Sequence, residues 1–426
     1  MAALTKLLEA APRYVGLLKS QYWPAERLNL YREERIKSTL AAAAKIPFYA
    51  ERLGKAPGAE DFPRLPILRR CDVDALYSSV RVIYPAGTPF THAASSGTSG
   101  PRAEFLFDRS HQRGRNAARV RYLRANGWNP VQRSVWLAGA GFLNPNYNDG
   151  YEDRQFASRI LVGVRFLAIS EEFSKLAAEM AKIDPLYIYS YPSVLDGILR
   201  VFEERRLQLR SLRRVFCGGE VLDDSVRERA RRVLEVDISE NYGSTEAFIA
   251  WQCRAGNHHL NAEHVVVELV DEDGRQVAAG QIGRVLVTTL ENYLMPLVRY
   301  EIGDYAVAAE GRCPCGRTLP LIGRVIGRGM NLFRRIDGTL LSTWDLVNTL
   351  LEIAAIKLFQ IVQTAFDRML IKYVADTELE REVESKIRSE FTTYVGTGMR
   401  IDFERLSRIS RTPGGKYMVT LSQVSG

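Results

Sequence analysis

A short run of small hydroxylated residues and glycines, Ser-Ser-Gly-Thr-Ser-Gly, lies between Ala94 and Pro101. Glycines let backbone N–H groups turn toward one point and the hydroxyls add further donors, so such a loop can wrap a phosphate chain. It differs from a Walker A loop because no Gly-Lys-Ser/Thr follows, and the same composition also occurs in ordinary Ser/Gly loops. The candidate phosphate-binding residues are Ser95, Ser96, Gly97, Thr98, Ser99 and Gly100.

Three of the five cysteines and three of the five histidines cluster in one later part of the sequence. Cys253 is followed six residues later by His259, and Cys313 and Cys315 flank a single proline ahead of a glycine. Four thiolate and imidazole ligands can close a tetrahedral zinc site, and a Cys-x-Cys-Gly turn is typical of a metal knuckle. The residue types leave His258 as a competing nitrogen ligand. Buried thiols without a metal are the alternative to a site.

Four further motifs follow in order: Gly-Gly-Glu (218–220), Asn-Tyr-Gly-Ser-Thr-Glu (241–246), Arg-Tyr-Glu-Ile-Gly-Asp (299–304) and Arg-Thr-Pro-Gly-Gly-Lys (411–416). Together with the Ser/Gly loop they resemble the adenylate-forming superfamily of acyl-CoA synthetases, peptide-synthetase adenylation domains and luciferases. Three stretches are similar to its phenylacetate–CoA ligase branch: Ile-Pro-Phe-Tyr (46–49), Leu-Pro-Ile-Leu (65–68) and Tyr-Ser-Tyr-Pro-Ser (189–193). The resemblance runs from about residue 40 to 418 and rests on five ordered motifs.

The resemblance implies a ligase that activates a carboxylic acid with ATP and Mg²⁺ and transfers the acyl group to coenzyme A. Charge builds on phosphate oxygens in the first step, so catalysis is mainly positioning and electrostatic stabilisation. Glu246 would bind Mg²⁺, a hard cation that prefers carboxylate oxygens. Tyr242 would stack on adenine and Asp304 would accept the ribose hydroxyls. The other implied nucleotide-site residues are Gly218, Gly219, Glu220, Gly243, Ser244 and Thr245.

Two basic residues complete the implied machinery. Lys416, in a Gly-Gly-Lys turn, would contact the transferred carboxylate and the α-phosphate, delivered by a small C-terminal domain that moves. Arg328, just before the interdomain hinge, would bind phosphate or ribose oxygens. The sequence departs from the family pattern in two places, at Gly100-Pro101-Arg102, where Arg102 replaces a lysine as the candidate cation, and at Met330-Asn331, where the family has two aspartates.

The family branch also implies an aromatic acid and a structural metal. Its acid pocket would be lined here by Tyr189, Tyr191, Gly141 and Phe142. A similar Cys/His set occurs in part of the branch as a structural zinc site. That similarity favours His259 over His258 as the nitrogen ligand.

The elements that must position these residues alternate between helix and strand from about residue 105 to 310. Helices are expected at 109–125, 171–183 and 194–205, and strands at 159–168, 187–191 and 215–217. This alternation predicts α/β layers with buried strands. Short strands with glycine turns between residues 263 and 309 predict an antiparallel β subdomain.

After Arg328 the pattern changes to a separate α+β module. Thr377 and Glu380 have the spacing of a capping box, and Leu379, Val383, Ile387 and Phe391 repeat every four residues as one apolar stripe. The expected fold class is therefore α/β, with a large N-terminal domain (1–327) that binds ATP and the acid and a small C-terminal α+β domain (328–426) that carries Lys416.

The composition is that of a globular protein, with 46% hydrophobic and 25% charged residues among 426, which excludes a collagen, a disordered tail and a disulfide scaffold. A net charge of +8 suits nucleotides, coenzyme A or acidic proteins and is too weak to predict nucleic-acid binding. No apolar run approaches about 18 residues, and charges interrupt the N-terminal apolar stretch, so neither membrane insertion nor a signal peptide is expected. We expect a cytoplasmic protein with reduced cysteines, in which Cys71 and Cys217 are core residues.

Six arginines crowd the expected helix at 109–125. They favour a solvated helix face over nucleic-acid binding, since few aromatic residues are interleaved to stack on bases; docking of an acidic carrier protein or of the coenzyme A 3′-phosphate is a third interpretation. Two other functions stay open: transfer of the acyl group to an amine, a hydroxyl or a carrier-protein thiol, and a degenerate nucleotide-binding protein without catalysis. A homodimer is also left open.

Overall fold

The computed structural model describes residues 2–53, 57–84, 88–94, 103–138, 163–328, 332–351, 353–409 and 419–424. These residues divide into two compact units, which are described separately. The first holds most of the chain up to residue 325, and the second holds Gly303–Tyr305 and the chain from Ile326 onward.

The first unit begins with helices and two short 3₁₀ turns, followed by a β ribbon. The elements are α1 (Ala2–Ser20), α2 (Ala25–Ala43), α3 (Pro47–Leu53), η1 (Phe62–Arg64), η2 (Arg70–Asp72), α4 (Val73–Ile83), β1 (Thr91–Ala94) and β2 (Glu104–Phe107). The predicted helix at 109–125 is confirmed with the same bounds as α5 (Arg109–Ala125). It begins where the Asp108 carboxylate accepts a hydrogen bond of 2.8 Å from the His111 amide.

An eleven-stranded sheet forms the centre of the fold, in the order β10-β11-β12-β13-β9-β8-β7-β6-β5-β3-β4. Its strands are β3 (Ser134–Ala138), β4 (Val164–Ala168), β5 (Tyr187–Ser190), β6 (Arg214–Gly218), β7 (Ile238–Gly243), β8 (Phe248–Gln252), β9 (His258–Leu260), β10 (Val265–Val270), β11 (Ile282–Thr289), β12 (Tyr300–Ala308) and β13 (Leu321–Arg328). The helices between them are α8 (Phe173–Ile183), α9 (Pro192–Arg205) and α10 (Asp224–Leu234).

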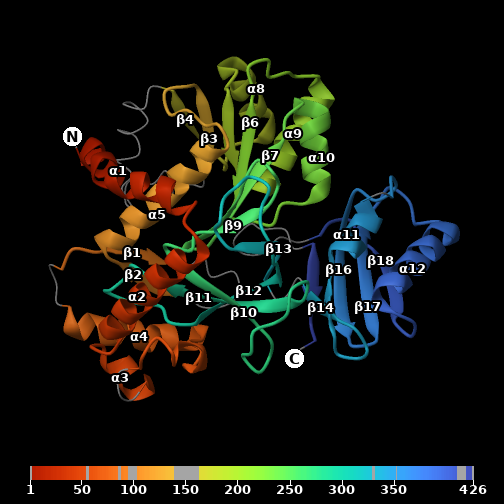
Figure 1. Ribbon diagram of the computed structural model, residues 1–426. Helices are drawn as coiled ribbons and strands as arrows, with labels where there is room; N and C mark the ends of the chain where they lie inside the picture. The colour runs from red at the N-terminus through yellow and green to blue at the C-terminus, as the bar shows by residue number, and fades with distance from the viewer. Residues whose placement is uncertain are drawn as a thin grey trace. The chain divides into compact units, whose positions relative to one another are not determined.

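The strands β3 to β7 are parallel and are covered on both faces, as the α/β prediction requires. Side chains on one face of the sheet, such as Ile188 and Val215, pack against α8, α9 and α10. Side chains on the opposite face, such as Tyr187 and Phe216, pack against α5 and α1. Figure 1 shows α9 and α10 on one side of β6 and β7 and α5 on the other.

The antiparallel strands predicted between residues 263 and 309 are present, but they do not form a separate sheet. β10 pairs with β11 in an antiparallel ladder, and β13 joins β9 through the register Leu321↔His259. Because β9 continues through β8 to β7, the antiparallel part is one end of the central sheet.

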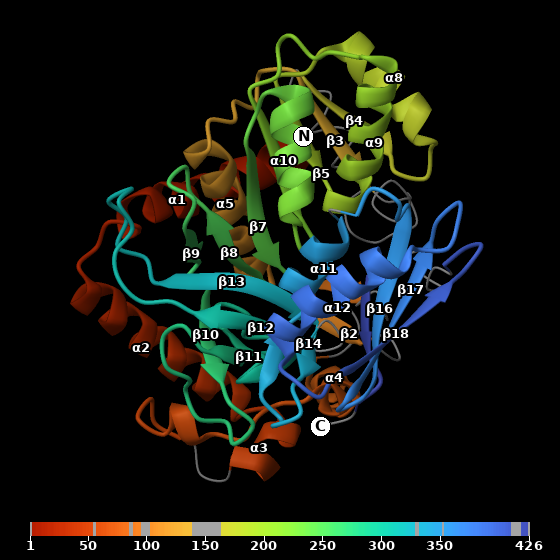
Figure 2. The same ribbon diagram turned by 90° about the vertical axis from the view of Figure 1, so that its right-hand side faces the viewer.

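The second unit contains a four-stranded sheet in the order β18-β17-β16-β19, with helices α11 and α12 over it (Figure 2). Its elements are β14 (Leu332–Arg334), β15 (Leu340–Ser342), α11 (Trp344–Leu351), β16 (Leu358–Ala365), β17 (Arg368–Val374), α12 (Arg381–Val395), β18 (Arg400–Arg405) and β19 (Thr420–Ser422). The predicted apolar stripe is confirmed, since Leu379, Ile387 and Phe391 are buried.

The predicted capping box at the start of α12 is wrong. The N-cap residue is Glu380, and its side chain makes no capping hydrogen bond. The Leu379 amide instead donates to the Tyr373 hydroxyl at 3.2 Å, so the residue before the cap is held by β17 rather than by a capping pair. Cys71 is also not a core residue, because it is exposed in the η2 turn, whereas Cys217 is buried as predicted.

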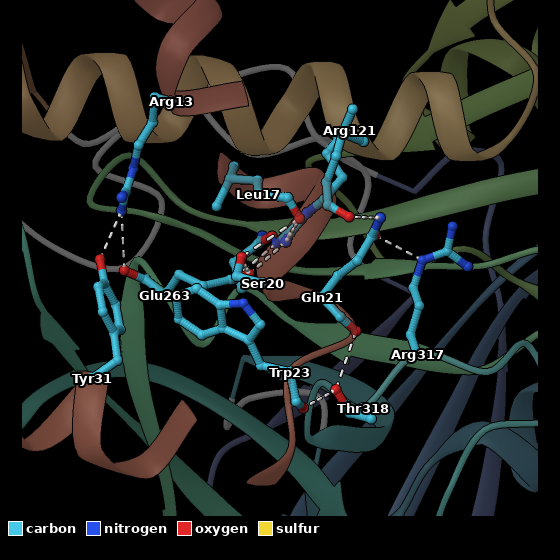
Figure 3. Close-up of polar contacts among 12 residues, drawn as sticks. Arg13, Leu17, Ser20, Gln21, Trp23, Tyr31, Arg121, Glu263, Arg317 and Thr318 are labelled. Atoms are coloured by element: carbon cyan, nitrogen blue, oxygen red, sulfur yellow. Dashed lines mark hydrogen bonds and ion pairs between the residues drawn. The ribbon is translucent and has the colours of Figure 1, made fainter. Parts of the chain in front are cut away.

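The arginine-rich helix α5 is not simply a solvated face, because Arg121 is 1% exposed. Its guanidinium binds both oxygens of the Glu263 carboxylate, at 2.7 and 3.0 Å. The Ser20 hydroxyl donates to the same carboxylate at 2.6 Å, as Figure 3 shows. Burial would raise the pKa of Glu263, but the adjacent Arg121 charge holds it below its usual value.

The link between α1 and α2 is attached to the segment that follows the Cys-x-Cys pair. The Arg317 guanidinium donates to the Gln21 side-chain oxygen at 2.9 Å, and the Thr318 hydroxyl donates to the Trp23 carbonyl at 2.6 Å (Figure 3). The N-terminal helices thus pack as part of the first unit. Among the helices of the described ranges, none has the length and apolarity needed to span a bilayer.

Candidate functional site

Three parallel strands, β5, β6 and β7, bring predicted site residues to one edge of the sheet. Their register pairs Ser190 with Cys217 and Gly218 with Asn241, so the three carboxyl ends are level. In open α/β sheets, ligands bind outside the carboxyl ends of the strands. The two predicted pocket tyrosines, the Gly-Gly-Glu motif and the start of the Asn-Tyr-Gly-Ser-Thr-Glu motif therefore lie where the fold positions a ligand.

The two glycines of the Gly-Gly-Glu motif are required by close packing. A Cβ on Gly218 would lie 2.5 Å from the Asn241 amide nitrogen. That nitrogen donates to the Tyr189 hydroxyl at 3.1 Å and to the Cys217 carbonyl at 2.8 Å. Gly219 has a φ of +83°, and a Cβ there would lie 2.8 Å from the Tyr191 ring. The edge is therefore built from backbone and ring contacts that a larger residue would displace.

Replacing Gly219 with alanine is expected to destabilise the protein by about 1–3 kcal/mol, because the new methyl group pushes the Tyr191 ring. The resemblance, which implies that Tyr191 lines an acid pocket, predicts that the KM for the acid rises as well. Gly280→Ala is the matched control, since Gly280 has a φ of +80° and no heavy atom within 4 Å of the added Cβ. Urea unfolding and acid-dependent pyrophosphate exchange measure the two effects. Equal KM values for the two variants would contradict the contact.

Glu246 lies in the four-residue turn between β7 and β8. The Ser244 amide donates to the Ala247 carbonyl at 2.9 Å and closes the turn. The Arg115 guanidinium holds it from α5 by donating to the carbonyls of Thr245 and Ser244, at 3.1 and 3.4 Å. The Glu246 side chain is 6% exposed, and no donor or cation of the described ranges pairs with its carboxylate. A buried, unpaired carboxylate on a fixed turn suits a cation ligand.

Aromatic side chains gather near the carboxyl ends of the neighbouring strands β3 and β5. The ring centroid of Tyr189 is 5.5 Å from that of Trp136, and Tyr191 lies against Gly219. Tyr242, predicted to stack on adenine, is partly buried and packs against the apolar cluster of the antiparallel strands. Glu220 accepts a hydrogen bond of 3.0 Å from the Ser193 amide at the start of α9.

The second unit brings two further predicted residues together. Arg328 Nε lies 3.2 Å from a carboxylate oxygen of Asp304. Gly303, the residue before Asp304 in β12, has a φ of +82°, and a Cβ there would lie 2.9 Å from the Arg328 guanidinium. The sequence motifs placed these residues in separate roles, whereas here they form one ion pair.

Several predicted site residues lie outside the described residues. They are Ser95, Ser96, Gly97, Thr98, Ser99, Gly100, Arg102, Gly141, Phe142, Met330, Asn331 and Lys416.

The four predicted zinc ligands form one group. Their ligand atoms all lie within 4.8 Å of one another, with Cys253 Sγ 3.5 Å from Cys313 Sγ and Cys315 Sγ 3.3 Å from His259 Nε2. Bond lengths of about 2.3 Å to sulfur and 2.0 Å to nitrogen place tetrahedral ligands about 3.3–3.8 Å apart. The group therefore has the size of a zinc site.

The competing histidine points elsewhere. His258 Nε2 lies 2.9 Å from the Glu240 carboxylate, whereas His259, the next residue in β9, is fully buried within the group. Successive strand residues face opposite sides of a sheet, which separates the two. Burial lowers the pKa of His259 to about 4, so its imidazole is neutral at pH 7 and can donate a lone pair to a metal.

Sequence reasoning missed three parts of this edge: the Asn241 side chain, and Arg115 and Arg119 of α5. The arginines were assigned to a solvated face. Their spacing of four residues places them on one face of the helix and was the available signal.

Two family models match the chain. Residues 158–294 match the AMP-binding enzyme family, and residues 334–423 match the CapK C-terminal domain.

Two curated relatives are similar to the chain. Phenylacetate-coenzyme A ligase of Thermus thermophilus is 25% identical over 93% of each chain. Protein CapK of Staphylococcus aureus is 24% identical over 60% of this chain and 57% of its own length.

Among solved structures, a 2-hydroxyisobutyryl-CoA ligase in the postadenylation state with an acyl-adenylate has a TM-score of 0.75, with 18% identity over 95% of this chain and 93% of that chain. An open conformation of that ligase, in complex with 2-HIB-AMP and CoA, has a TM-score of 0.68, with 19% identity over 96% and 95%. These structures share the fold of the present chain.

Proposed function

Because this chain is an AMP-forming ligase of the adenylate-forming superfamily, in the branch similar to phenylacetate–CoA ligases, we propose that it activates an aromatic carboxylic acid with ATP and passes the acyl group to coenzyme A. The observation that carries the proposal is the buried, unpaired Glu246 carboxylate on a turn held by Arg115, beside the close-packed Gly218-Gly219 edge.

In the first half-reaction an oxygen of the acid attacks the α-phosphorus of ATP, and the bond to the bridging oxygen of pyrophosphate breaks. Glu246 would hold Mg²⁺, which neutralises charge on the phosphate oxygens. The turn that carries Glu246 is fixed before substrate binds, so little reorganisation is needed when charge develops. Ser95 to Gly100 would bind the β- and γ-phosphates, and Lys416 the α-phosphate and the attacking carboxylate.

The nucleoside would lie along the ends of β6 and β7. Tyr242 would stack on adenine opposite the backbone of Gly218, Gly219 and Glu220, and the Asp304 carboxylate would accept both ribose hydroxyls. Arg328, paired with Asp304 at 3.2 Å, would orient that carboxylate and bind a phosphate or ribose oxygen. Gly243, Ser244 and Thr245 complete the proposed nucleotide site.

In the second half-reaction the thiolate of coenzyme A attacks the acyl carbon, and AMP leaves with one oxygen of the acid. We assign the binding of ATP and the acid to a large domain (1–327), and Lys416 to a small domain (328–426). We also propose a cytoplasmic location, where ATP and coenzyme A would both be available. An aromatic acid is supported by Trp136 and Tyr189, whose ring centroids are 5.5 Å apart, and by Tyr191 beside Gly219.

The test is acid-dependent ATP–pyrophosphate exchange across a panel of aryl and aliphatic acids, first without an acceptor and then with coenzyme A. The proposal predicts exchange with aryl acids and, on adding coenzyme A, a thioester and AMP in equal amounts. Exchange without thioester formation would mean that the acyl acceptor is not coenzyme A but an amine, a hydroxyl or a carrier-protein thiol. ATP binding with no exchange for any acid would favour a protein that binds nucleotide without catalysis.

We also propose that Cys253, His259, Cys313 and Cys315 hold a structural zinc ion. Four protein ligands leave no open position, so the ion would connect the turn after β8 to the loop before β13 rather than take part in catalysis. The inter-ligand distances of 3.5 and 3.3 Å support this assignment.

Metal analysis of the purified protein is expected to give about one zinc per chain, and Cys313→Ser is expected to remove most of it and to lower the melting temperature. Cys71→Ser is the matched control, because Cys71 is exposed and lies outside the group. Less than about half an equivalent of zinc in the wild-type protein, purified without chelators, would refute the site.

A further inference from the structure

Helix α5 carries a second arginine, Arg119, near the carboxyl ends of β5, β6 and β7. Arg119 follows Arg115 by one helical turn, and residues four apart lie on the same face. Arg115 binds the turn that carries Glu246 through the carbonyls of Thr245 and Ser244. Arg119 thus lies next to the proposed nucleotide site, on the side away from the start of the helix.

The Arg119 guanidinium lies against Phe248, the first residue after the Glu246 turn. Its Cζ is 5.9 Å from the Phe248 ring centroid, and Phe248 is 2% exposed. Arg119 itself is only partly exposed, and its Nε is buried without a hydrogen-bond acceptor. Throughout the described part of the chain, no carboxylate forms an ion pair with it.

Phe248 fixes where the guanidinium lies relative to the sheet. It is the first residue of β8, and β8 pairs antiparallel with β7 through the register Gly243↔Phe248. The Arg119 guanidinium therefore lies at the carboxyl ends of the parallel strands. Tyr191, which directly follows β5, belongs to the same end of the sheet; burial raises the pKa of its phenol, and the positive charge of Arg119 acts in the opposite direction.

One acidic side chain at these strand ends, Glu220, already accepts a hydrogen bond from the protein. Glu220 acts on the same tyrosine, but one of its oxygens accepts the Ser193 amide at 3.0 Å. A partly buried guanidinium without a counter-ion loses hydration that no protein group replaces. A carboxylate on a ligand would supply both the charge and two parallel hydrogen-bond acceptors.

We propose that Arg119 is a specificity-determining residue that binds a second anionic group on the acid, so that the preferred substrate is an aromatic dicarboxylate. One carboxylate is activated at the α-phosphate and the other pairs with Arg119. This inference rests on the proposed function, since it takes Tyr191 as a wall of the acid pocket.

The test compares matched acids that differ by one carboxylate: benzoate with isophthalate and terephthalate, and phenylacetate with phenylenediacetate. Wild-type protein is expected to show kcat/KM for pyrophosphate exchange at least about 10-fold higher for the dicarboxylate of each pair. Arg119→Met is expected to remove or reverse that ratio, mainly through KM for the dicarboxylate. Arg119→Lys is expected to retain part of it, because a lysine keeps the charge without the fork of donors.

Arg109→Met is the matched control, because Arg109 is an exposed arginine of the same helix, and its ratio should equal that of the wild type. Melting temperatures establish that each variant is folded. Equal kcat/KM for both members of every pair in the wild-type protein, or an unchanged ratio in a folded Arg119→Met, would overturn the inference while leaving acid activation intact. Absence of exchange with every acid would instead contradict the proposed function itself.

Discussion

Glu246→Gln is expected to lower the rate of acid-dependent pyrophosphate exchange by about 100-fold or more, the usual cost of removing a group that stabilises charge in the transition state. Glutamine keeps the size of the side chain but loses the charge that a divalent cation requires. The fold should be unaffected, because no group of the described ranges pairs with the Glu246 carboxylate. Raising the Mg²⁺ concentration should restore part of the rate if the lost interaction is with the cation.

Glu228→Gln is the control for this experiment, since Glu228 is an exposed glutamate of α10. It removes the same charge from the same unit without touching the turn. Exchange within threefold of wild type for Glu246→Gln would show that the carboxylate holds no cation in the reaction, and the assignment of this turn would fail.

Arg121→Met is expected to cost about 3–5 kcal/mol of unfolding free energy, because it leaves the Glu263 carboxylate buried and uncompensated. Glu263 is 1% exposed, and among the described residues the Ser20 hydroxyl and the backbone amide of Glu263 itself are the donors that would remain for its carboxylate. Urea unfolding of the variant measures the loss. Catalytic constants of the folded fraction should change little.

The double variant Arg121→Met/Glu263→Leu separates charge from packing. Removing both partners leaves no buried charge, so most of the loss should be recovered. Arg109→Met, on the exposed face of the same helix, should change stability by less than about 0.5 kcal/mol. A single Arg121→Met variant as stable as this control would contradict the pairing shown in Figure 3.

The helices and strands of the first unit were predictable because their own residues and immediate neighbours indicate them. The apolar run at 187–191 and the strand at 215–217 ending in two glycines are typical of buried parallel strands, and both occur as β5 and β6. The helix at 109–125 was predictable from its Asp108 start and its Gly127 stop, where φ is +93°. A helix or strand could be predicted wherever residues at its ends mark where it starts or stops.

Other features depended on partners far away in the sequence. The burial of Arg121 requires Glu263, 142 residues away, and nothing local distinguishes this arginine from its neighbours. The fusion of the antiparallel strands with the central sheet depends on β13 pairing with β9. At α12 the helix begins at Arg381 with Glu380 as its N-cap, so Glu380 cannot be the third helical residue that the predicted capping box requires; the Tyr373 hydroxyl, from β17, accepts the Leu379 amide.

The candidate site follows the same rule. The motifs predicted a set of site residues, and the level ends of β5, β6 and β7 bring motifs tens of residues apart to the same end of the sheet. The resemblance favoured His259 over His258, and the strand supplies the physical reason, since successive residues face opposite sides of the sheet and His258 lies beside Glu240. Arg119 was missed because its ring contact, Phe248, lies in a distant strand.

The central claim is that this chain joins an acid to AMP before transfer, and isotope transfer tests it most directly. The preferred acid, labelled with ¹⁸O in its carboxylate, is incubated with ATP, Mg²⁺ and coenzyme A, and the products are analysed by mass spectrometry. The account predicts one ¹⁸O in each AMP formed and none in pyrophosphate, because the attacking oxygen leaves with the α-phosphate. Release of ADP and ¹⁸O-labelled orthophosphate would mean an acyl-phosphate route and would contradict the account.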